Sequence, residues 1–329
     1  MAKVISMINW KGGVGKSTLS LHLGVGLMLG SDEHPKVLLI DLDPQSNLSY
    51  LALGVEKYVR HVYTKKKPTL KNIFDDYFDG KQFHTRDAII KQPITASPGQ
   101  VWINVDLLPS HHELVLVDMM LAREKKSAST HQKETELELD KMAIIKKAID
   151  QVAEDYDYII LDCPPNINLV TQNAFFASEL YLIPAIPDFL STVGISLIKS
   201  EMDKLNKNFR GMIQYSNSSI EFNDTEMLGI IFNMVDEYNK KPKETHEDTI
   251  NDVKKQHPNM VFNNYITAGD GISVASENNL TVFSHSSLPR SKPKEGANKQ
   301  VISSQADSLI KISRIWADFF PANTSNQPI

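Results

Sequence analysis

Residues 11–18 combine two lysines, three glycines and two hydroxyl side chains in one short run. Glycine permits tight turns in which successive backbone N–H groups point at one anion, and a helix that follows adds the positive end of its dipole. An ammonium neutralises phosphate charge, and a hydroxyl is a ligand for Mg²⁺. We therefore predict a phosphate-binding loop whose nucleotide contacts are Lys11, Gly12, Gly13, Val14, Gly15, Lys16, Ser17 and Thr18.

The segments that flank this run are those that a phosphate loop requires. Residues 4–8 are an apolar run that predicts a buried strand, and residues 17–29 have the apolar content of a helix packed into a sheet. The alternative, a Gly-rich turn that arose by chance, is disfavoured because strand, turn and helix come in the required order. Lys16 is then the charge for the β- and γ-phosphates, and Ser17 is a Mg²⁺ ligand.

Two acidic residues follow apolar strands elsewhere in the chain. Asp162 ends the strand predicted at 158–161, and Asp43 follows the strand predicted at 37–40. Open α/β sheets bind ligands at the carboxyl ends of their strands, so we expect Asp162 to hold Mg²⁺, through water. The alternative for Asp162 is a solvated acid at a strand end. Asp41 has two equally weighted interpretations, support of the site from behind and simple turn chemistry.

Continuous apolar strands that alternate with helices predict an α/β fold, with one doubly wound, mostly parallel sheet and helices on both faces. We predict a single domain over residues 1–320, with surface insertions around 54–100 and 124–135 and a disordered tail at 321–329. Further predicted elements are strands at 101–108, 180–183 and 227–232, an exposed loop at 124–135, and helices at 70–78, 110–123, 137–152, 169–177, 192–209, 245–256 and 300–320.

Composition narrows the class of protein. The chain has 329 residues, 41% of them hydrophobic, which is enough for a sizeable core. Cys163 is the single cysteine, which excludes a disulfide framework and a cysteine-based metal site. No apolar stretch approaches the ~20 residues of a membrane span, so we expect a cytoplasmic protein without a membrane partner. The net charge of −5 argues against a protein that coats DNA with its whole surface, but it is compatible with a local basic patch.

The loop departs from the standard phosphate-loop pattern, because Trp10 stands where the first glycine is expected and Lys11 follows it. The K-G-G-x-G-K-[ST] form resembles the deviant Walker A motif of the ParA/MinD family of partitioning and positioning ATPases. The resemblance implies that Lys11 reaches across a dimer interface to the partner's nucleotide; the alternative is that Lys11 contacts only its own subunit or solvent. It also implies a catalytic set of Lys11, Lys16, Asp43 and Asp162.

The same resemblance extends to three further sites. Asp43, in the run Asp-x-Asp-Pro-Gln, would orient the attacking water and help to bind the metal together with Ser17 and Asp162. Residues 162–165, Asp-Cys-Pro-Pro, match the start of a nucleotide-sensing loop. Asn233 stands where family members place an asparagine that binds adenine, and a simple strand-end cap is an equally weighted alternative.

The resemblance implies a slow, partner-stimulated ATPase that converts ATP and water to ADP and phosphate and uses Mg²⁺. Such a protein forms an ATP-dependent sandwich dimer, associates with duplex DNA of the nucleoid without sequence preference, and segregates a plasmid or chromosome with a ParB-like adaptor. Short partition ATPases are the expected subgroup, because the glycine-rich loop begins at residue 11 and leaves no room before it for a helix-turn-helix extension. The C-terminal segment lacks the amphipathic membrane helix of MinD.

Two alternatives differ from this assignment, one in what the ATPase moves and the other in the class of protein. The first is an ATPase of the same family that positions a protein organelle or cluster on the nucleoid. The second is a metabolic enzyme of the same superfamily, such as a nitrogenase-reductase-like protein or a synthetase. Nitrogenase-type reductases need several cluster-ligating cysteines, which disfavours that assignment for a chain with one cysteine.

The contacts to DNA are predicted from charge alone. Arg290, Lys292, Lys294 and Lys299 are four cations accompanied only by Glu295, a pattern that can neutralise phosphates. A solvated charged loop is an equally weighted interpretation. The lysine-rich segments 65–67 and 240–243 are candidates of lower rank.

Overall fold

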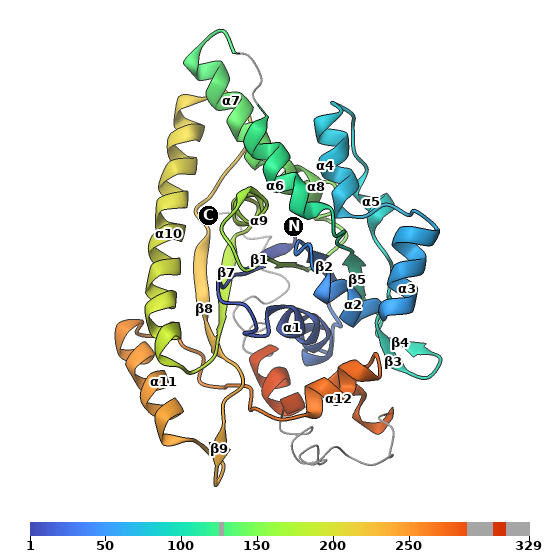
Figure 1. Cartoon of the computed structure of the whole chain (residues 1–329), viewed down its shortest axis with the longest axis vertical. Coiled ribbons are helices and arrows are strands. Elements are labelled where there is room, and N and C mark those ends of the chain that lie inside the picture. The colour runs from blue at the N-terminus through green and yellow to red at the C-terminus, as the bar shows by residue number, and fades with distance from the viewer. Residues whose placement is uncertain (125–127, 288–304, 314–329) are drawn as a thin grey trace.

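A computed structural model describes residues 1–124, 128–287 and 305–313 of the chain, and at its centre is one sheet whose neighbouring strands all run parallel (Figure 1). The predicted α/β fold with a parallel sheet is confirmed. Its strands consist mainly of apolar residues buried on both sides, as in sheets covered by helices on each face. In spatial order they are β5 (Val105–Leu108), β2 (Val37–Asp41), β6 (Tyr158–Asp162), β1 (Lys3–Met7), β7 (Leu180–Ala185) and β8 (Glu226–Phe232).

The strand order places the sheet's reversal point beside β1. Strands β2 and β5 lie on one side of β1, whereas β7 and β8 lie on the other. Met7 pairs with Asp162, and Asp162 pairs with Asp41, so β1, β6 and β2 end at the same level. Open α/β sheets bind ligands outside the carboxyl ends of strands at such a reversal.

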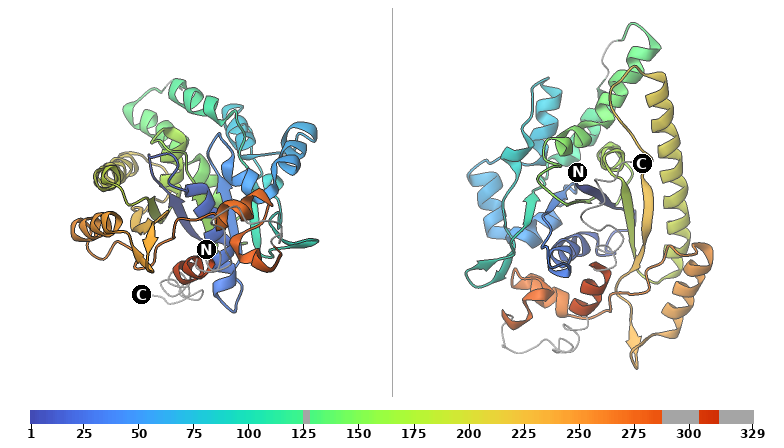
Figure 2. Two further views of the ribbon diagram at one scale, coloured as in Figure 1. Left: turned by 60° about the horizontal axis from the view of Figure 1, so that its bottom comes forward. Right: turned by 180° about the vertical axis from the view of Figure 1, so that it is seen from behind.

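Helices cover both faces of the sheet, as two separate hydrophobic clusters show (Figures 1 and 2). On one face lie α1 (Lys16–Gly30), α2 (Asn47–Leu53), α3 (Val55–Val59), α12 (Gly271–Glu277), the 3₁₀ turn η2 (Val282–Ser287) and the helical residues 305–313. On the other lie α4 (Leu70–Phe78), α5 (Thr85–Ala88), α6 (Leu114–Arg123), α7 (His131–Met142), α8 (Ile144–Asp150), α9 (Leu169–Ala177), α10 (Phe189–Tyr215) and α11 (Glu244–Gln256).

The remaining elements are small. The π-helical turn η1 (Arg60–Thr64) continues α3, and two short antiparallel ribbons project from the body. The ribbons are formed by β3 (Thr95–Ser97) with β4 (Gln100–Val101), and by β9 (Glu237–Tyr238) with β10 (Lys241–Pro242).

Three predicted elements were wrong in their extent. The strand predicted at 101–108 is two strands, because Asn104 has a positive φ of 59° and turns the chain between β4 and β5. The helix predicted at 137–152 is broken at Ala143, where the buried Asn173 side chain accepts hydrogen bonds from the first N–H groups of α8. The loop predicted at 124–135 gives way to helix α7 from His131 onward, with a Thr130 cap.

Segment 54–100 folds into α3, η1, α4, α5 and the β3–β4 ribbon. Helix α4 from this segment buries Leu70, Ile73 and Phe74 against the main core. The predicted tail at 321–329 lies outside the described residues, as does the predicted 300–320 helix except for residues 305–313, which are helical.

Candidate functional site

The glycine-rich loop between β1 and α1 has the backbone conformation that its glycines predict. Gly13 and Gly15 adopt positive φ angles of 76° and 84°, which other residues rarely adopt. A Cβ atom at Gly15 would lie 2.3 Å from Nδ2 of Asn233, so a larger residue has no space there. Helix α1 begins at Lys16 directly after this turn, and its positive dipole end lies at the loop.

Lys16 lies inside the loop. It is 7% exposed, and its Nζ donates to the carbonyl oxygen of Asn9 at 2.9 Å. Burial lowers the pKa of Lys16, and the nearby Asp162 carboxylate opposes that shift. Asn9 is itself anchored, because its side-chain amide donates to the Pro184 carbonyl at 2.7 Å. The ammonium is thereby held within the curve of the loop, where an anion would lie.

Asp162 is fully buried at the end of β6 and faces the start of α1. Its Oδ1 accepts a hydrogen bond from the Ser20 hydroxyl at 3.2 Å, whereas its buried Oδ2 has no hydrogen-bond partner among the described residues. Burial raises the pKa of Asp162 to about 6, although the Ser17 hydroxyl and Lys16 act to lower it. A buried carboxylate oxygen without a partner normally needs a cation or a water molecule, so this site fits a divalent metal ion.

Asp41 is the last residue of β2, Asp43 lies in the turn that follows, and the two have different environments. Asp41 accepts hydrogen bonds from the Ser49 N–H and hydroxyl at 2.8 and 2.7 Å, and from the Asp43 N–H at 3.1 Å. Burial and the Asp162 charge raise the pKa of Asp41. The Asp43 carbonyl accepts from the Ser110 hydroxyl at 2.6 Å, and its Oδ1 accepts from the Gln45 N–H at 2.9 Å. Asp41 therefore supports the turn that carries Asp43.

Lys11 lies at the mouth of the loop and forms an ion pair with Asp188, whose side chain also caps α10. The two side chains are 35% and 38% exposed. Partial burial acts to raise the pKa of Asp188, but hydrogen bonds from Lys11 and Ser191 hold it below its usual value. Next to this pair, Phe189 and Leu190 in the first turn of α10 are 78% and 68% exposed. The outer lysine is thus bordered by an exposed apolar surface.

Asn233 follows β8 and contacts the phosphate loop. Its Nδ2 donates to the Val14 carbonyl at 3.0 Å, and its Oδ1 accepts from the Met234 N–H at 2.9 Å. The residue is buried. In the structure, Asn233 therefore holds the loop backbone, and the contact to adenine stays a prediction.

Several residues of the site were not predicted from the sequence. Asn9 receives the Lys16 ammonium, Ser20 binds Asp162, Asp188 pairs with Lys11, and Ser49 and Ser110 support the Asp41–Asp43 turn. For Asp188 a signal was present, because aspartate directly before a helix is a favoured N-cap residue. Ser110 binds Asp43, and the Asn9 side chain is anchored to Pro184; both partners are far away in sequence and left no local signal.

The predicted DNA contacts Arg290, Lys292, Lys294 and Lys299 lie outside the described residues. Of the lower-ranked candidates, the lysines of segments 65–67 and 240–243 are exposed. Among the helices that the structure describes, none combines the length and the apolar character that crossing a membrane requires.

Comparison with known proteins adds to this geometry. A family model described as "AAA domain" (AAA_31) matches residues 2–215. The virulence plasmid ParA family protein pGP5-D of Chlamydia psittaci is 30% identical over 237 residues, which cover 72% of this chain and 71% of the relative. The sporulation initiation inhibitor protein Soj of Bacillus subtilis is 31% identical over 209 residues, with 63% and 68% covered.

The fold is shared with solved structures. A McdA variant of Cyanothece in complex with ATP superposes with a TM-score of 0.65 at 19% identity, covering 95% of this chain and 96% of that protein. Loop, acidic strand ends and fold thus define a P-loop nucleotide-binding protein. The chain belongs to the ParA/MinD family of ATPases.

Proposed function

We propose that this chain is a ParA-type ATPase that binds ATP with Mg²⁺ and segregates a plasmid or chromosome together with a ParB-like adaptor. The observation that carries the proposal is the convergence, at one edge of the sheet, of the glycine-rich loop, the buried Lys16 and the partnerless Oδ2 of Asp162. Further support is the similarity to proteins named for plasmid and chromosome functions, including a chromosome-partitioning ATPase Soj of Treponema pallidum.

Each residue has a defined task in this proposal. The backbone N–H groups of residues 12–18 and the Lys16 ammonium hold the phosphates, and Ser17, Asp43 and Asp162 hold Mg²⁺. The metal supplies charge that neutralises the phosphates during transfer. Asp43 orients the attacking water, and its turn is fixed by Asp41 and Ser110. Asp162 is the group whose structure most directly supports its task, because one of its oxygens is buried and unsatisfied.

Lys11 would act in a second subunit. In a dimer with the two loops face to face, each Lys11 leaves Asp188 and reaches the nucleotide of the other chain. Such an interface is isologous, so the exposed Phe189 and Leu190 beside Lys11 would contribute twice to its apolar area. ATP favours this approach because its phosphate charge compensates two basic loops that otherwise repel each other. The dimer would be slow to hydrolyse ATP until the adaptor binds.

The proposal is tested by ATP-dependent binding to DNA. We expect the wild-type chain with a non-hydrolysable ATP analogue and Mg²⁺ to bind duplexes of unrelated sequence equally, with affinity that falls steeply as salt rises. Replacing Arg290, Lys292 and Lys294 together by Glu should abolish that binding and leave ATP binding intact.

A matched control for the charge reversal is replacement of Lys36, Lys57 and Lys81, three exposed lysines, by Glu. If the triple variant at 290–294 binds DNA with the wild-type salt dependence, the DNA-binding patch lies elsewhere, and segments 65–67 and 240–243 are tested next. If no nucleotide state of the wild type binds DNA, the partition function is wrong even if ATP is hydrolysed.

A further inference from the structure

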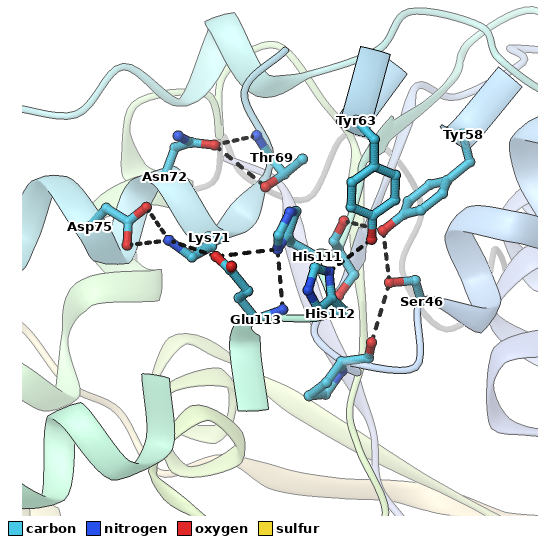
Figure 3. Close-up of polar contacts among 12 residues, drawn as sticks. Ser46, Tyr58, Tyr63, Thr69, Lys71, Asn72, Asp75, His111, His112 and Glu113 are labelled. Carbon is cyan, nitrogen blue, oxygen red and sulfur yellow. Dashed lines mark hydrogen bonds and ion pairs between the residues drawn. The ribbon is translucent and has the colours of Figure 1, made fainter. Parts of the chain in front are cut away.

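A pocket of about 310 Å³ lies next to the Asp43 turn, at the carboxyl end of β5. Three separate chain segments line it: η1 with the turn that follows, the start of α4, and residues 111–113 (Figure 3). We call it the His–Lys pocket after the side chains that dominate its lining, Tyr63, Lys66, Lys67, Lys71, His111 and His112.

Aromatic rings fix one wall of the His–Lys pocket. The Tyr63 hydroxyl and Nδ1 of His112 share a hydrogen bond of 2.8 Å, and the ring centroids of His111 and His112 lie 4.5 Å apart. Tyr63 also packs against His111, at 5.7 Å between centroids. Figure 3 shows the two histidines between Tyr63 on one side and Glu113 with Lys71 on the other. These contacts place two imidazole groups at the pocket in a defined arrangement.

The charges of the pocket do not balance. Lys71 is paired with Asp75 at 2.6 Å and with Glu113 at 3.4 Å, so both acidic groups of the lining are engaged there. No ion pair of Lys66 or Lys67 is present among residues 1–124, 128–287 and 305–313. Two exposed ammonium groups therefore remain without a carboxylate in a pocket that also carries two histidines. A concave surface of this kind attracts an anion.

The backbone around the pocket adds to its positive electrostatic potential. Thr69 and Glu113, which precede the first residues of α4 and α6, belong to the lining, so the positive dipole ends of two helices lie at the pocket. The Thr69 hydroxyl and the Asn72 side-chain oxygen at the lining are already engaged in the capping box of α4, so the hydroxyl at the pocket wall is that of Tyr63. Ammonium, imidazole and hydroxyl groups together are suited to phosphate oxygens.

We propose that the His–Lys pocket is a second anion site, separate from the glycine-rich loop, and that it binds a phosphate group. The phosphate can belong to a nucleic-acid backbone or to a free phosphorylated small molecule, because both present the same oxygens. The volume, about 310 Å³, lies at the lower end of the range of small-ligand pockets and accommodates a phosphate with an attached sugar.

The location of this site near Asp43 links it to the nucleotide site. The Tyr58 hydroxyl donates to the Ser110 carbonyl at 3.1 Å and shares a 3.0 Å hydrogen bond with the Ser46 hydroxyl. Ser110 in turn donates to the Asp43 carbonyl at 2.6 Å. A ligand held by His111 and His112 thus lies one residue away from the group that positions Asp43.

The test follows the two histidines directly. The ring resonances of the ten histidines are recorded by NMR on the full chain with isotope-labelled histidine, and His111→Gln and His112→Gln assign the two signals. Inorganic phosphate, a mononucleotide and a short DNA duplex are then added in separate titrations. We expect saturable shifts of the His111 and His112 signals in at least one titration. Because Ser110 links the pocket to the Asp43 turn, each titration is repeated with Lys16→Ala, which is expected to lose nucleotide binding at the glycine-rich loop, and shifts that persist in this variant belong to the His–Lys pocket.

A double variant tests the lysines. Lys66→Gln with Lys67→Gln should weaken the affinity by at least about tenfold, because each lost charged hydrogen bond is worth about that factor. Lys57→Gln with Lys81→Gln removes the same charge from two exposed residues that do not line the pocket, and should leave the affinity unchanged.

The outcomes separate clearly. A response to the duplex alone identifies a nucleic-acid backbone, and a response to phosphate or mononucleotide identifies a small phosphorylated ligand. The proposal is overturned if no titration shifts these signals, or if the Lys66 and Lys67 variant responds like the wild type. None of these outcomes depends on ATP hydrolysis, so the partition function and this site fail independently.

Discussion

The two lysines of the glycine-rich loop lie only five residues apart in sequence but occupy opposite environments. Lys16 is buried and bound to the Asn9 carbonyl, whereas the Lys11 side chain is 35% exposed and pairs with Asp188 at the start of α10. The inner lysine is held by its own β1–α1 unit. The outer lysine is held by an element that comes more than 170 residues later. The difference indicates that one end of the loop serves the chain's own site and the other faces a surface.

The surroundings of the two ends differ in the same way. Around Lys16, the Asp162 and Asp41 side chains are fully buried and joined to serines on α1 and α2. Around Lys11, Phe189 and Leu190 are exposed. A buried, hydrogen-bonded end is suited to holding a small anion with fixed geometry. An exposed, partly apolar end is suited to contact with another protein chain.

The largest expected effect is at the Lys16 end of the glycine-rich loop, which we call the inner end; the Lys11 end is the outer end. Lys16→Ala removes the ammonium that neutralises phosphate charge, so we expect calorimetry to detect no ATP binding. Lys36→Ala removes an exposed lysine and should bind ATP like the wild type. A Lys16→Ala protein with wild-type affinity would show that the loop is not the phosphate site.

Asp43→Ala tests the acidic turn behind the inner end. We expect ATP binding to be retained and hydrolysis to fall by roughly 10²–10⁴-fold, because the group that positions the attacking water is lost. Asp43→Asn keeps an acceptor for the Gln45 N–H and should lose the same rate, which separates chemistry from folding of the turn. Unchanged turnover of either variant with the adaptor present would remove Asp43 from the catalytic set.

Lys11→Ala tests the outer end. If Lys11 acts on the nucleotide of the other subunit, this variant binds ATP as a monomer but does not dimerise in analytical ultracentrifugation with a non-hydrolysable analogue. Asp188→Asn is the informative partner, because it can keep the cap on Ser191 while it releases Lys11. Dimerisation should survive in Asp188→Asn. Normal dimerisation of Lys11→Ala, or its loss in both variants, would contradict the role of Lys11 across the interface.

The smallest expected effect concerns helix α1, which begins at Lys16. His22 on α1 is fully buried, and burial lowers its pKa to about 4. Its Nδ1 hydrogen-bonds to the Thr18 carbonyl and its Nε2 accepts from the Val282 N–H, so protonation of Nε2 would break that second contact. The unfolded chain protonates this histidine below about pH 6.5, whereas the folded chain keeps it neutral to about pH 4.

The free energy of unfolding should therefore fall by about 2 kcal/mol from this residue alone as the pH drops from 7.5 to 5. Urea unfolding of the wild type and of His22→Gln at both pH values measures this contribution as the difference between their pH dependences. His131→Gln, which removes an exposed histidine, should keep the wild-type dependence. Equal pH dependence of the wild type and His22→Gln would show that this buried histidine is not responsible.

Much of the fold could be predicted because its signals are local. The apolar runs that became β1, β2, β6, β7 and β8 are continuous, and parallel strands buried on both faces need such runs. One of the errors lies where a distant residue decides. Asn173 on α9 ends the helix predicted at 137–152 by binding the first N–H groups of α8, and no pattern within that segment reports this.

The sequence by itself determined the chemistry of the candidate site. The order of glycines, lysines and hydroxyls at 11–18, and acids placed directly after apolar strands, specify a phosphate loop because conformation and charge there are properties of consecutive residues. Tertiary structure alone decided how these groups are held. The pairing of Lys11 with Asp188, the hold of Ser110 on Asp43, the contact of Asn233 with Val14, and the His–Lys pocket all join residues far apart in the chain. Strand order brings such residues together, and strand order is set by the packing of the whole sheet.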